Sequence, residues 1–360
     1  MDINNKYSLK GFYRGKTVLV TGHTGFKGSW LSIWLKKLGA KVIGYGLDPY
    51  TTNGNFVVCN LENKMVDIRA DIRDEEKLKY IFNKYKPEIV FHLAAQPLVR
   101  LSYKIPKETY DVNVIGSFNV LECIKNTNSV KVGVIITTDK CYKNKEQIWG
   151  YRETDPLGGY DPYSSSKACA EILIDSYRNS FINPNKYKEH GKAISSVRTG
   201  NVIGGGDWSK NRLIPDCIRS LYSNKKIEIR NPNSIRPWQH VLEPLYGYLL
   251  LGKQMYFHGV NYSGAWNFGP DFESIVTVET IVNTIIDKWG SGTWIDLSHK
   301  KEPHEATLLN LDCTKAKTYL HWKPKLNIEE ALAYTVYWYK NYKNENIYKL
   351  CLDQINEYSK

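Results

Sequence analysis

The chain lacks the long apolar segments that a membrane protein needs. No apolar run in its 360 residues approaches the ~20 residues required to cross a bilayer. Residues 1–16 are polar and contain no apolar stretch of the kind found in secretory signals. We therefore expect neither a signal sequence nor a membrane partner, and we expect a cytoplasmic location.

Disulfide and metal-binding patterns are absent as well. The seven cysteines form an odd set without a Cys-x-x-Cys pair, which excludes a disulfide framework and a zinc ribbon. None of the eight histidines shows His-x-x-x-His spacing, so no metal site is predicted. We expect reduced and mostly buried thiols at Cys59, Cys123, Cys141, Cys169, Cys217, Cys313 and Cys351.

Runs of basic residues are missing too, although the chain is basic overall. Lysine and arginine number 49 against 37 aspartate and glutamate residues, which gives a formal net charge of +12. Such a charge favours anionic partners, but the lysines are scattered and no run of five basic residues occurs. We interpret the charge as a basic, solvated surface and predict no nucleic-acid partner.

What the chain does contain, over its first ~200 residues, is an alternation of apolar strands and helical stretches. The expected elements are strands at 17–21, 42–43, 88–93 and 132–136 and helices at 30–38 and 106–125. Continuous apolar strands are typical of parallel sheets that are buried on both faces. The order of elements predicts an α/β fold with a Rossmann-type, doubly wound parallel sheet.

A glycine-rich segment, residues 22–28, follows the first expected strand and precedes a helix. Glycines at this spacing permit a tight turn and let backbone N–H groups approach a pyrophosphate at the helix N-terminus. We expect Lys27 to point to solvent, because it lies between the second and third glycines. The predicted contacts with a dinucleotide are Gly22, Thr24, Gly25, Phe26, Lys27 and Gly28.

Asp48 ends the second expected strand, twenty residues after Gly28. A carboxylate at this place can accept hydrogen bonds from the adenosine ribose and repels a 2′-phosphate. No arginine follows the second strand, so NAD is the predicted cofactor. The alternative is a turn aspartate before Pro49. Asp71 and Ile72, after the third strand, are predicted to contact the adenine edge.

Tyr163 and Lys167 lie four residues apart, which on a helix places both on one face. A neighbouring ammonium, together with the nicotinamide cation, can lower the pKa of a phenol from ~10 towards neutrality. The pair follows residues 137–140 at the end of the fifth strand, where ligands of open parallel sheets bind. Without that context, the two residues would be an ordinary surface pair.

The pattern of elements changes near residue 200, after which glycine, proline and tryptophan are frequent and helical stretches are shorter. We predict an NAD-binding domain over residues 1–200, which includes the Tyr-Lys helix. Residues 201–360 are predicted to form a smaller, mixed region that mainly binds the substrate. No linker of low complexity separates the two regions, so we expect them to pack tightly.

Over nearly its whole length the chain resembles the nucleotide-sugar 4,6-dehydratases of the extended short-chain dehydrogenase/reductase family. The glycine segment and the Tyr-Lys pair are shared by the whole superfamily. The Lys140-containing and Trp208-containing segments resemble the branch that acts on CDP-glucose. The segments that carry the resemblance are residues 21–30, 94–100, 139–142, 158–163, 204–208 and 235–241.

The resemblance implies a redox-neutral lyase that retains NAD through its cycle. Tyr163 would take the proton from the sugar O4 while the C4 hydride passes to NAD⁺, and Thr138 would hydrogen-bond the same O4. Lys167 would orient the nicotinamide ribose. Asp139 would protonate the departing O6, a role that requires a raised pKa. The hydride would then return to C6.

Lys140 departs from the pattern of relatives that act on dTDP-glucose, which carry a glutamate here as base for the C5 proton. An ammonium cannot accept a proton. Lys140 is therefore either neutral in the site or a cation that stabilises the enolate, and the identity of the base stays open. A third interpretation is that Lys140 only balances the charge of Asp139.

Further contacts are implied by the resemblance alone. Two guanidinium groups suit a diphosphate, and Trp208 and Trp238 are candidate pocket walls. The implied cofactor contacts are Ala94, Ala95, Gln96, Thr137, Tyr163 and Lys167. The implied substrate contacts are Gln96, Asn201, Arg212, Leu213, Arg236, His240, Asn267 and His304.

The resemblance also implies a homodimer, or a homotetramer built from it, paired through helices 106–125 and 163–181. Its product would supply deoxysugars for surface polysaccharide. Three alternatives remain: a nucleotide-sugar 4-epimerase, a dehydratase for another nucleotide sugar, and a dinucleotide-sensing regulator. The epimerase needs no acid at Asp139, and the intact Thr138, Tyr163 and Lys167 count against the regulator.

Overall fold

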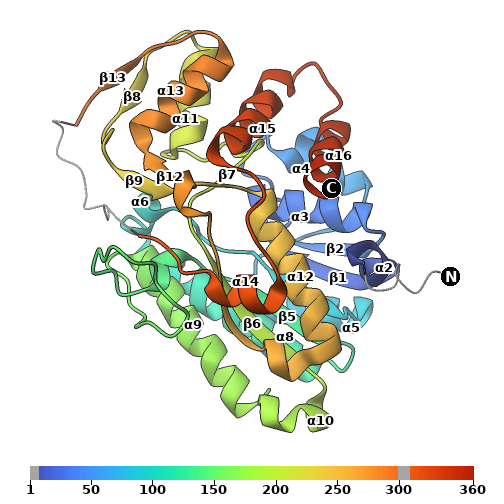
Figure 1. Cartoon of the computed structure of the whole chain (residues 1–360). Helices are drawn as coiled ribbons and strands as arrows, with labels where there is room; N and C mark the ends of the chain where they lie inside the picture. Colours follow the sequence, from blue (N-terminus) through green and yellow to red (C-terminus); the bar gives the residue numbers. More distant parts are fainter. Residues whose placement is uncertain (1–7, 299–308) are drawn as a thin grey trace.

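The computed structural model describes residues 8–298 and 309–360. Its centre is a seven-stranded sheet with the strand order β11-β6-β5-β4-β1-β2-β3, and every neighbouring pair is parallel (Figure 1). The strands are β1 (Thr17–Thr21), β2 (Lys41–Gly46), β3 (Val66–Arg69), β4 (Ile89–His92), β5 (Val132–Ile136), β6 (Ala193–Thr199) and β11 (Gly264–Phe268). The predicted doubly wound parallel sheet is confirmed.

Helices cover both faces of the sheet because successive strand residues point to opposite sides. Val18 and Val20 of β1 pack in one apolar cluster, which includes residues of α3 (Phe26–Lys37) and α12 (Leu242–His258). Leu19 packs in another cluster, on the side of α5 (Glu75–Tyr85), α8 (Gly116–Asn126) and α9 (Pro162–Ser180). This double burial explains why the central strands are continuous apolar runs.

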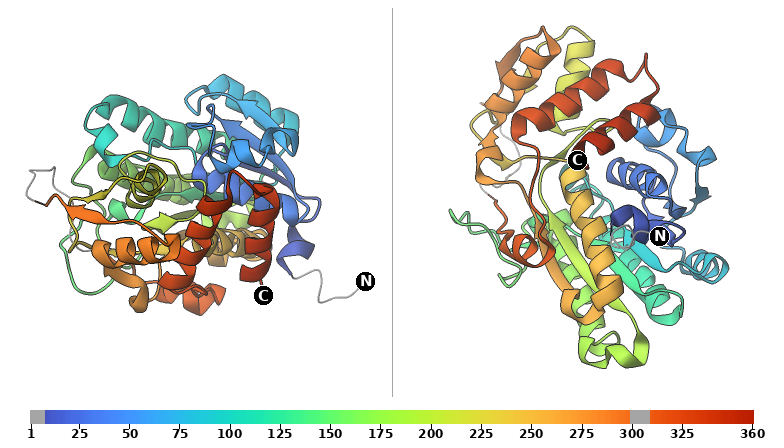
Figure 2. Two further views of the ribbon diagram at one scale, coloured as in Figure 1. Left: turned by 90° about the horizontal axis from the view of Figure 1, so that it is seen from above. Right: turned by 45° about the vertical axis from the view of Figure 1, so that its right-hand side comes forward.

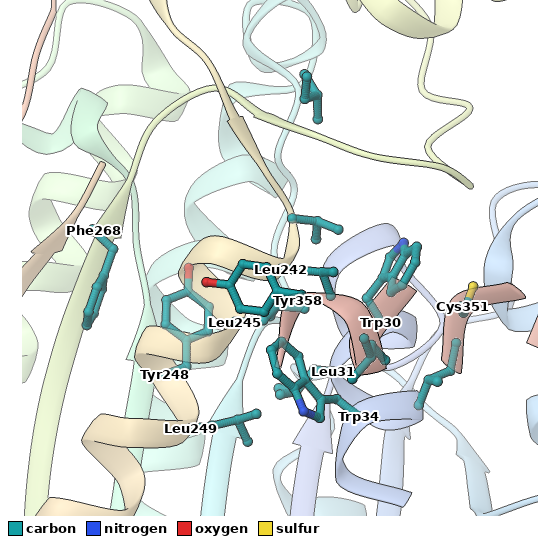
Figure 3. Packing of buried hydrophobic residues seen from close by; sticks show 14 of the residues in the cluster. Trp30, Leu31, Trp34, Leu242, Leu245, Tyr248, Leu249, Phe268, Cys351 and Tyr358 are labelled. Atoms are coloured by element: carbon teal, nitrogen blue, oxygen red, sulfur yellow. The ribbon is translucent and has the colours of Figure 1, made fainter. Parts of the chain in front are cut away.

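The larger cluster joins the two ends of the chain (Figure 3). Trp30 and Trp34 of α3 pack beside Leu245 of α12 and beside Tyr358 of α16 (Ile347–Tyr358). All four side chains are buried. Tyr13, near the N-terminus, donates a hydrogen bond to the Leu249 carbonyl over 2.9 Å. The glycine-rich segment at the start of α3 is therefore held against a rigid core.

The helix expected at 106–125 is present but contains a π-helical turn. It consists of α7 (Pro106–Tyr110), the π turn η2 (Asp111–Ile115) and α8. Within the turn, the Asn113 side chain bonds the backbone N–H and carbonyl of Gln96 and donates to Ser166 Oγ over 2.9 Å. The turn thus ties the segment after β4 to α9, the helix that carries Tyr163 and Lys167.

The C-terminal part forms a second lobe, which lies above the sheet in Figure 1 and in the right-hand view of Figure 2. Its elements include α11 (Leu213–Tyr222), α13 (Val278–Trp289), α15 (Ile328–Asn341), the parallel pair β8 (Ile227–Ile229) and β13 (Trp294–Asp296), and the antiparallel pair β9 (Ile235–Pro237) and β12 (Ile275–Thr277). The strands β7 (Val202–Ile203) and β10 (Gln239–His240) pair beside it.

Two elements that come after residue 200, the predicted boundary, return to the sheet. Strand β11 pairs with β6 at its edge, and α12 packs on one of its faces. Residues 201–360 therefore serve both lobes. The other described elements are α2 (Leu9–Tyr13), α4 (Asn55–Val58), η1 (Leu61–Asn63), α6 (Val99–Ser102), η3 (Asp139–Cys141), η4 (Pro184–Lys186), α10 (Tyr187–His190), η5 (Gly259–Tyr262), η6 (Phe272–Ser274) and α14 (Thr314–Leu320).

The sequence led to predictions about the cysteine thiols and about membrane-spanning segments. All seven cysteines are free, and all except the half-buried Cys169 are buried, as predicted. Within residues 8–298 and 309–360, no helix combines the length and apolar character that a membrane span requires.

Candidate active site

A cavity of about 1010 Å³ lies at the carboxyl ends of the central strands. One wall consists of residues 137–140 after β5 and residues 199–204 at the end of β6. The opposite wall comes from the start of α11 and from β8 and β9 in the second lobe. Ligands of open parallel sheets bind at this edge, so the cavity is the candidate active site.

Tyr163 and Lys167 are positioned by the first turns of α9. The Asp161 side chain caps this helix by accepting from the Ser164 N–H over 2.9 Å, and Pro162 occupies the first turn. Tyr163 lines the cavity, and its backbone N–H donates to Ser102 Oγ over 3.1 Å. Lys167 is buried and donates to the Ile136 carbonyl at the end of β5 over 3.2 Å. The local sequence thus places both side chains at the same strand end.

Burial shifts the pKa values of Tyr163 and Lys167 away from their ordinary values. It raises the pKa of Tyr163 to about 12, against the lowering effects of the Thr138 hydrogen bond and the Arg212 guanidinium. It lowers the pKa of Lys167 to about 8. The phenol is therefore protonated at neutral pH in this structure, and a further positive charge beside it would lower its pKa and favour the phenolate, the form that can accept a proton.

Asp139 lies on the same wall, in the short helix η3. It is buried, and its Oδ1 accepts a hydrogen bond from Thr138 Oγ1 over 2.9 Å. Burial raises the pKa of Asp139 above its usual value, although Lys140 and Thr138 act in the opposite direction. A raised pKa suits a carboxyl that must donate a proton. Lys140 also lines the cavity.

The expectation that Lys27 points to solvent is wrong. Its ammonium donates to Thr199 Oγ1 over 3.1 Å and lines the cavity. Burial and, to a lesser degree, the Arg212 guanidinium lower the pKa of Lys27 to about 8. The reason is that α3 begins at Phe26, four residues earlier than expected, so Lys27 is a helical residue facing the end of β6.

The glycine segment forms a close cradle between β1 and α3. Gly22 has φ +69°, and a Cβ there would lie 2.7 Å from the Ala94 nitrogen. A Cβ at Gly28 would lie 2.1 Å from the Gly22 carbonyl oxygen. Gly25 caps the N-terminus of α3 without a side-chain hydrogen bond. A backbone cradle at a helix N-terminus fits a dinucleotide pyrophosphate.

The other predicted cofactor residues lie near this cradle. Thr24 donates to the Leu47 carbonyl over 2.9 Å, which ties the cradle to the end of β2. Ala94 and Ala95 follow β4, and the Ala94 N–H donates a hydrogen bond to Thr21 Oγ1 of β1. Ile72 is buried in the core cluster beside α5. Asp71 is held by Arg73, whose hydrogen bond lowers the pKa of the Asp71 carboxyl.

Asp48 has a partner that the sequence did not reveal. Its side chain is 89% exposed, and one oxygen lies 3.2 Å from Arg69 Nη1. Arg69 also bonds Asp67, and its guanidinium lies 4.7 Å from the centre of the Phe56 ring. Although no arginine follows β2 in the sequence, Arg69 at the end of β3 supplies a guanidinium beside Asp48. Arg69 was missed because it comes from β3, and strand adjacency is not visible in a single sequence.

On the substrate side, Asn201, Arg212, Leu213 and Arg236 line the cavity together with Trp238. Arg212 is fixed by Asp207, whose Oδ2 lies 2.8 Å from its Nη1. Against the effect of burial, Arg212 holds the pKa of Asp207 below its usual value. Asp207 was not predicted from the sequence as a site residue. Its position five residues before Arg212 was the signal that could have indicated this ion pair.

Three predicted contacts lie elsewhere. The His240 ring is fully buried and packs edge-on against Trp30 and Tyr334. The Asn267 side chain accepts from the Tyr142 hydroxyl and donates to two backbone carbonyls, so its hydrogen-bonding capacity is used inside the protein. The Gln96 side chain likewise bonds Leu98 and Thr109. His304 lies outside the described residues.

Trp208, the other predicted pocket wall, belongs to the second lobe's packing. Its Nε1 donates to the Asn53 carbonyl over 2.8 Å, and its ring packs against Tyr339 and Tyr342. Trp208 therefore braces the loop after β2 against α15. Of the two tryptophans considered, Trp238 is the one that lines the cavity.

Comparisons with known proteins identify relatives over most of the chain. Residues 19–335 match the family described as GDP-mannose 4,6 dehydratase. The chain is 53% identical over 332 residues to the CDP-glucose 4,6-dehydratase of Salmonella typhimurium, with 92% of each chain covered.

Two solved structures share the fold. An epimerase from Methanothermobacter thermautotrophicus has a TM-score of 0.81 at 24% identity, covering 93% of this chain and 95% of that one. The dTDP-glucose 4,6-dehydratase of Bacillus anthracis, in complex with NAD, has a TM-score of 0.73 at 24% identity, covering 94% and 100%.

Proposed function

The chain belongs to the GDP-mannose 4,6-dehydratase family, and from this premise we propose that it dehydrates CDP-glucose to CDP-4-dehydro-6-deoxyglucose with NAD as its cofactor. The observation that carries the reaction type is the buried Asp139, with its raised pKa, on the same cavity wall as Tyr163. The choice of CDP-glucose rests on the 53% identity to the Salmonella enzyme. We further propose that the product supplies deoxysugars for surface polysaccharide.

Each residue of the site has a separate role in the proposed reaction. The glycine cradle between β1 and α3 would hold NAD, which would supply the acceptor for the sugar C4 hydride and the donor that returns this hydride to C6. Tyr163, once the positive charge of bound NAD⁺ has favoured its phenolate form, would take the proton of the O4 hydroxyl, and Thr138, which bonds the phenol, would orient that hydroxyl. A basic group of the site takes the C5 proton while Asp139 donates its proton to O6 and the C6–O6 bond breaks, and the C5 proton is returned when the hydride reaches C6. Lys167, fixed at the end of β5, orients the nicotinamide ribose.

The second lobe holds the nucleotide in this proposal. Arg212, at the N-cap of α11, and Arg236, on β9, line the cavity and supply the guanidinium groups that a diphosphate requires. Asp207 holds Arg212 in place before the substrate arrives. Because the catalytic groups come from the sheet and the arginines from the second lobe, the sugar lies between the two.

Mass spectrometry of the product tests the proposed function. The enzyme is incubated with NAD⁺ and, separately, with CDP-glucose, dTDP-glucose and GDP-mannose. We expect CDP-glucose to lose one water, and to do so faster than the other two. An unchanged mass with all three would contradict a dehydratase, and a faster loss from another nucleotide sugar would contradict the proposed substrate.

Cofactor choice gives a first prediction. NAD⁺ is expected to bind more tightly than NADP⁺, because the Asp48 carboxylate opposes a 2′-phosphate. The exposure of Asp48 and the nearby Arg69 limit the difference to roughly tenfold, or about 1.4 kcal/mol. Asp48→Ala should narrow the gap, since it removes the carboxylate that opposes the 2′-phosphate and leaves Arg69 with Asp67 as its remaining carboxylate partner. Calorimetric titration of the apo-enzyme with each cofactor measures both effects.

A matched control is Asp271→Ala, which removes another exposed aspartate that pairs with a cation, Lys317 of α14, away from the glycine cradle. This variant should leave both cofactor affinities unchanged. Equal affinities of the unmodified enzyme for NAD⁺ and NADP⁺ would show that Asp48 is only a turn residue before Pro49.

Assembly gives a second prediction. The helical segments around the site expose apolar side chains: Ile115 is 50% exposed, Phe118 38% and Ile172 60%. We propose that α8 and α9 pair with those of a second copy to form a homodimer, or a homotetramer built from it. Light scattering at micromolar concentration should give at least the mass of a dimer, and Ile172→Glu should give that of a monomer.

The control for this variant is Phe272→Glu, which adds the same charge at an 82% exposed aromatic residue in the second lobe. This variant is expected to keep the mass of the unmodified protein. A monomeric unmodified protein would contradict the proposed pairing.

A further inference from the structure

A buried charge pair lies beneath the catalytic residues. Glu171 follows Lys167 by one turn of α9, and Arg198 lies on β6. Each side chain is less than 5% exposed, and Arg198 Nη2 lies 2.7 Å from Glu171 Oε2. A buried ion pair is a weak source of stability because desolvation offsets the attraction. Stability alone therefore does not explain why this ion pair lies beneath the catalytic residues.

The Glu171 carboxylate fixes one end of the segment that carries the catalytic groups. Its Oε1 accepts a hydrogen bond from the Thr137 hydroxyl, and its Oε2 accepts one from Ser196 Oγ over 2.7 Å. Thr137 is the residue that follows β5 and directly precedes Thr138. Through these bonds Glu171 joins α9 to both β5 and β6.

Arg198 fixes the other end of the same segment. Its Nη1 donates to the Tyr142 hydroxyl over 2.7 Å, and the guanidinium lies 4.8 Å from the centre of the Tyr142 ring. The Tyr142 hydroxyl in turn donates to Asn267 on β11. Residues 138–141, which include Thr138, Asp139 and Lys140, are thus held at both ends by one charge pair. This accounts for the internal position of Asn267.

Glu171 of this pair also affects the pKa of the Lys167 ammonium. Burial lowers the pKa of Lys167 to about 8, whereas the Glu171 carboxylate acts to raise it. Lys27 from α3 repels Lys167, and burial keeps His92 from β4 neutral, with a pKa of about 3. The Cys141 thiol from η3 also faces Lys167, and burial raises its pKa well above the ordinary value, so it stays neutral.

Glu171 is itself ionised. Burial alone would raise its pKa, but the Arg198 guanidinium and the Thr137 and Ser196 hydroxyl groups together hold it below its usual value. Of the groups described above, Glu171 is therefore the one that supplies a negative charge to Lys167 at neutral pH.

We propose that Glu171, paired with Arg198, is a positioning residue of the active site: it fixes both ends of segment 138–141 and supplies the counter-charge of Lys167. The inference rests on the proposed function, since it assigns a task to side chains that serve Tyr163, Asp139 and Lys167. The reaction scheme alone assigns no role to Glu171 or Arg198, whereas this proposal makes their pairing a requirement for catalysis.

The test compares the pH dependence of kcat/KM in the unmodified enzyme and in Glu171→Gln, with CDP-glucose and saturating NAD⁺. Lys167 acts as a cation below its pKa, so a lower pKa moves the alkaline loss of activity to lower pH. We expect the alkaline limb of Glu171→Gln to move by about one pH unit towards acid. We also expect kcat to fall while KM for CDP-glucose changes little.

The matched control is Glu243→Gln. Glu243 is a fully buried carboxylate on α12 that accepts from the Tyr358 hydroxyl over 2.6 Å, at a distance from the cavity wall. Its removal should lower the thermal unfolding temperature without moving the alkaline limb. A shift of the limb in this control equal to that of Glu171→Gln would overturn the proposal.

A second variant separates positioning from folding. Glu171→Gln alone leaves the Arg198 cation unpaired, which is expected to destabilise the fold. Glu171→Gln combined with Arg198→Met removes both charges and should recover thermal stability while kcat stays low and the alkaline limb stays shifted. Recovery of normal kcat and of the normal limb in the double variant would overturn the proposal, because the pair would then act only through stability.

The proposed function and this inference fail in different ways. Loss of water from CDP-glucose by the unmodified enzyme decides the function. If the enzyme turns over another nucleotide sugar, the same pH profiles are measured with that substrate, and an unmoved alkaline limb in both Glu171 variants overturns the positioning role alone.

Discussion

Tyr163→Phe is expected to abolish turnover while nucleotide-sugar binding stays nearly intact. Only the phenolic oxygen is lost, and removal of a general base typically costs ~10²–10⁴-fold. The ring of phenylalanine can keep the buried position of Tyr163, which is anchored through its backbone N–H to Ser102. Steady-state turnover and calorimetric titration with CDP-glucose measure the two quantities separately.

Tyr177→Phe is the matched control on the same helix. The Tyr177 hydroxyl bonds Glu122 of α8, and the residue lies about four turns beyond the active-site end of α9. Its loss is expected to leave turnover close to normal. Near-normal turnover of Tyr163→Phe would remove Tyr163 from the mechanism.

Asp139→Asn is expected to stop the reaction after the first hydride transfer. An amide has no proton to donate to O6, so dehydration should slow by ~10²–10⁴-fold, whereas Tyr163 can still accept the O4 proton. Enzyme-bound reduced nicotinamide should therefore accumulate, and its absorbance during a single turnover measures this. The buried position of Asp139 and its raised pKa are the grounds for this assignment.

The control is Asp155→Asn, an aspartate in the loop before α9 whose oxygens accept from Arg152. It should neither slow turnover nor accumulate reduced cofactor. If Asp139→Asn releases dehydrated product at the normal rate, another group is the acid.

The sheet was predictable because its signals are local. Strands buried on both faces must be continuously apolar, and β1, β4 and β5 show this pattern directly in the sequence. The close approach of Gly22 and Gly28 to their neighbours requires glycine, so the cradle was visible too. The same holds for the spacing of Tyr163 and Lys167 on one helix face.

Features that depend on which elements become neighbours could not be predicted. The pairing of β11 with β6 and the approach of Arg69 to Asp48 are set by strand order, which no local pattern encodes. Lys27 turned inward because α3 starts earlier than its apolar periodicity suggested. The resemblance implied substrate contacts for His240 and Asn267, and the structure shows both inside the protein.

The central claim is an internal transfer of hydride from C4 to C6 with loss of water. CDP-glucose carrying deuterium at C4 tests it most directly, with the product mass and the position of the label determined by mass spectrometry and NMR. We predict a product that has lost one water and retains the deuterium at C6. Dehydrated product without the label, or sugar of unchanged mass, would contradict the claim.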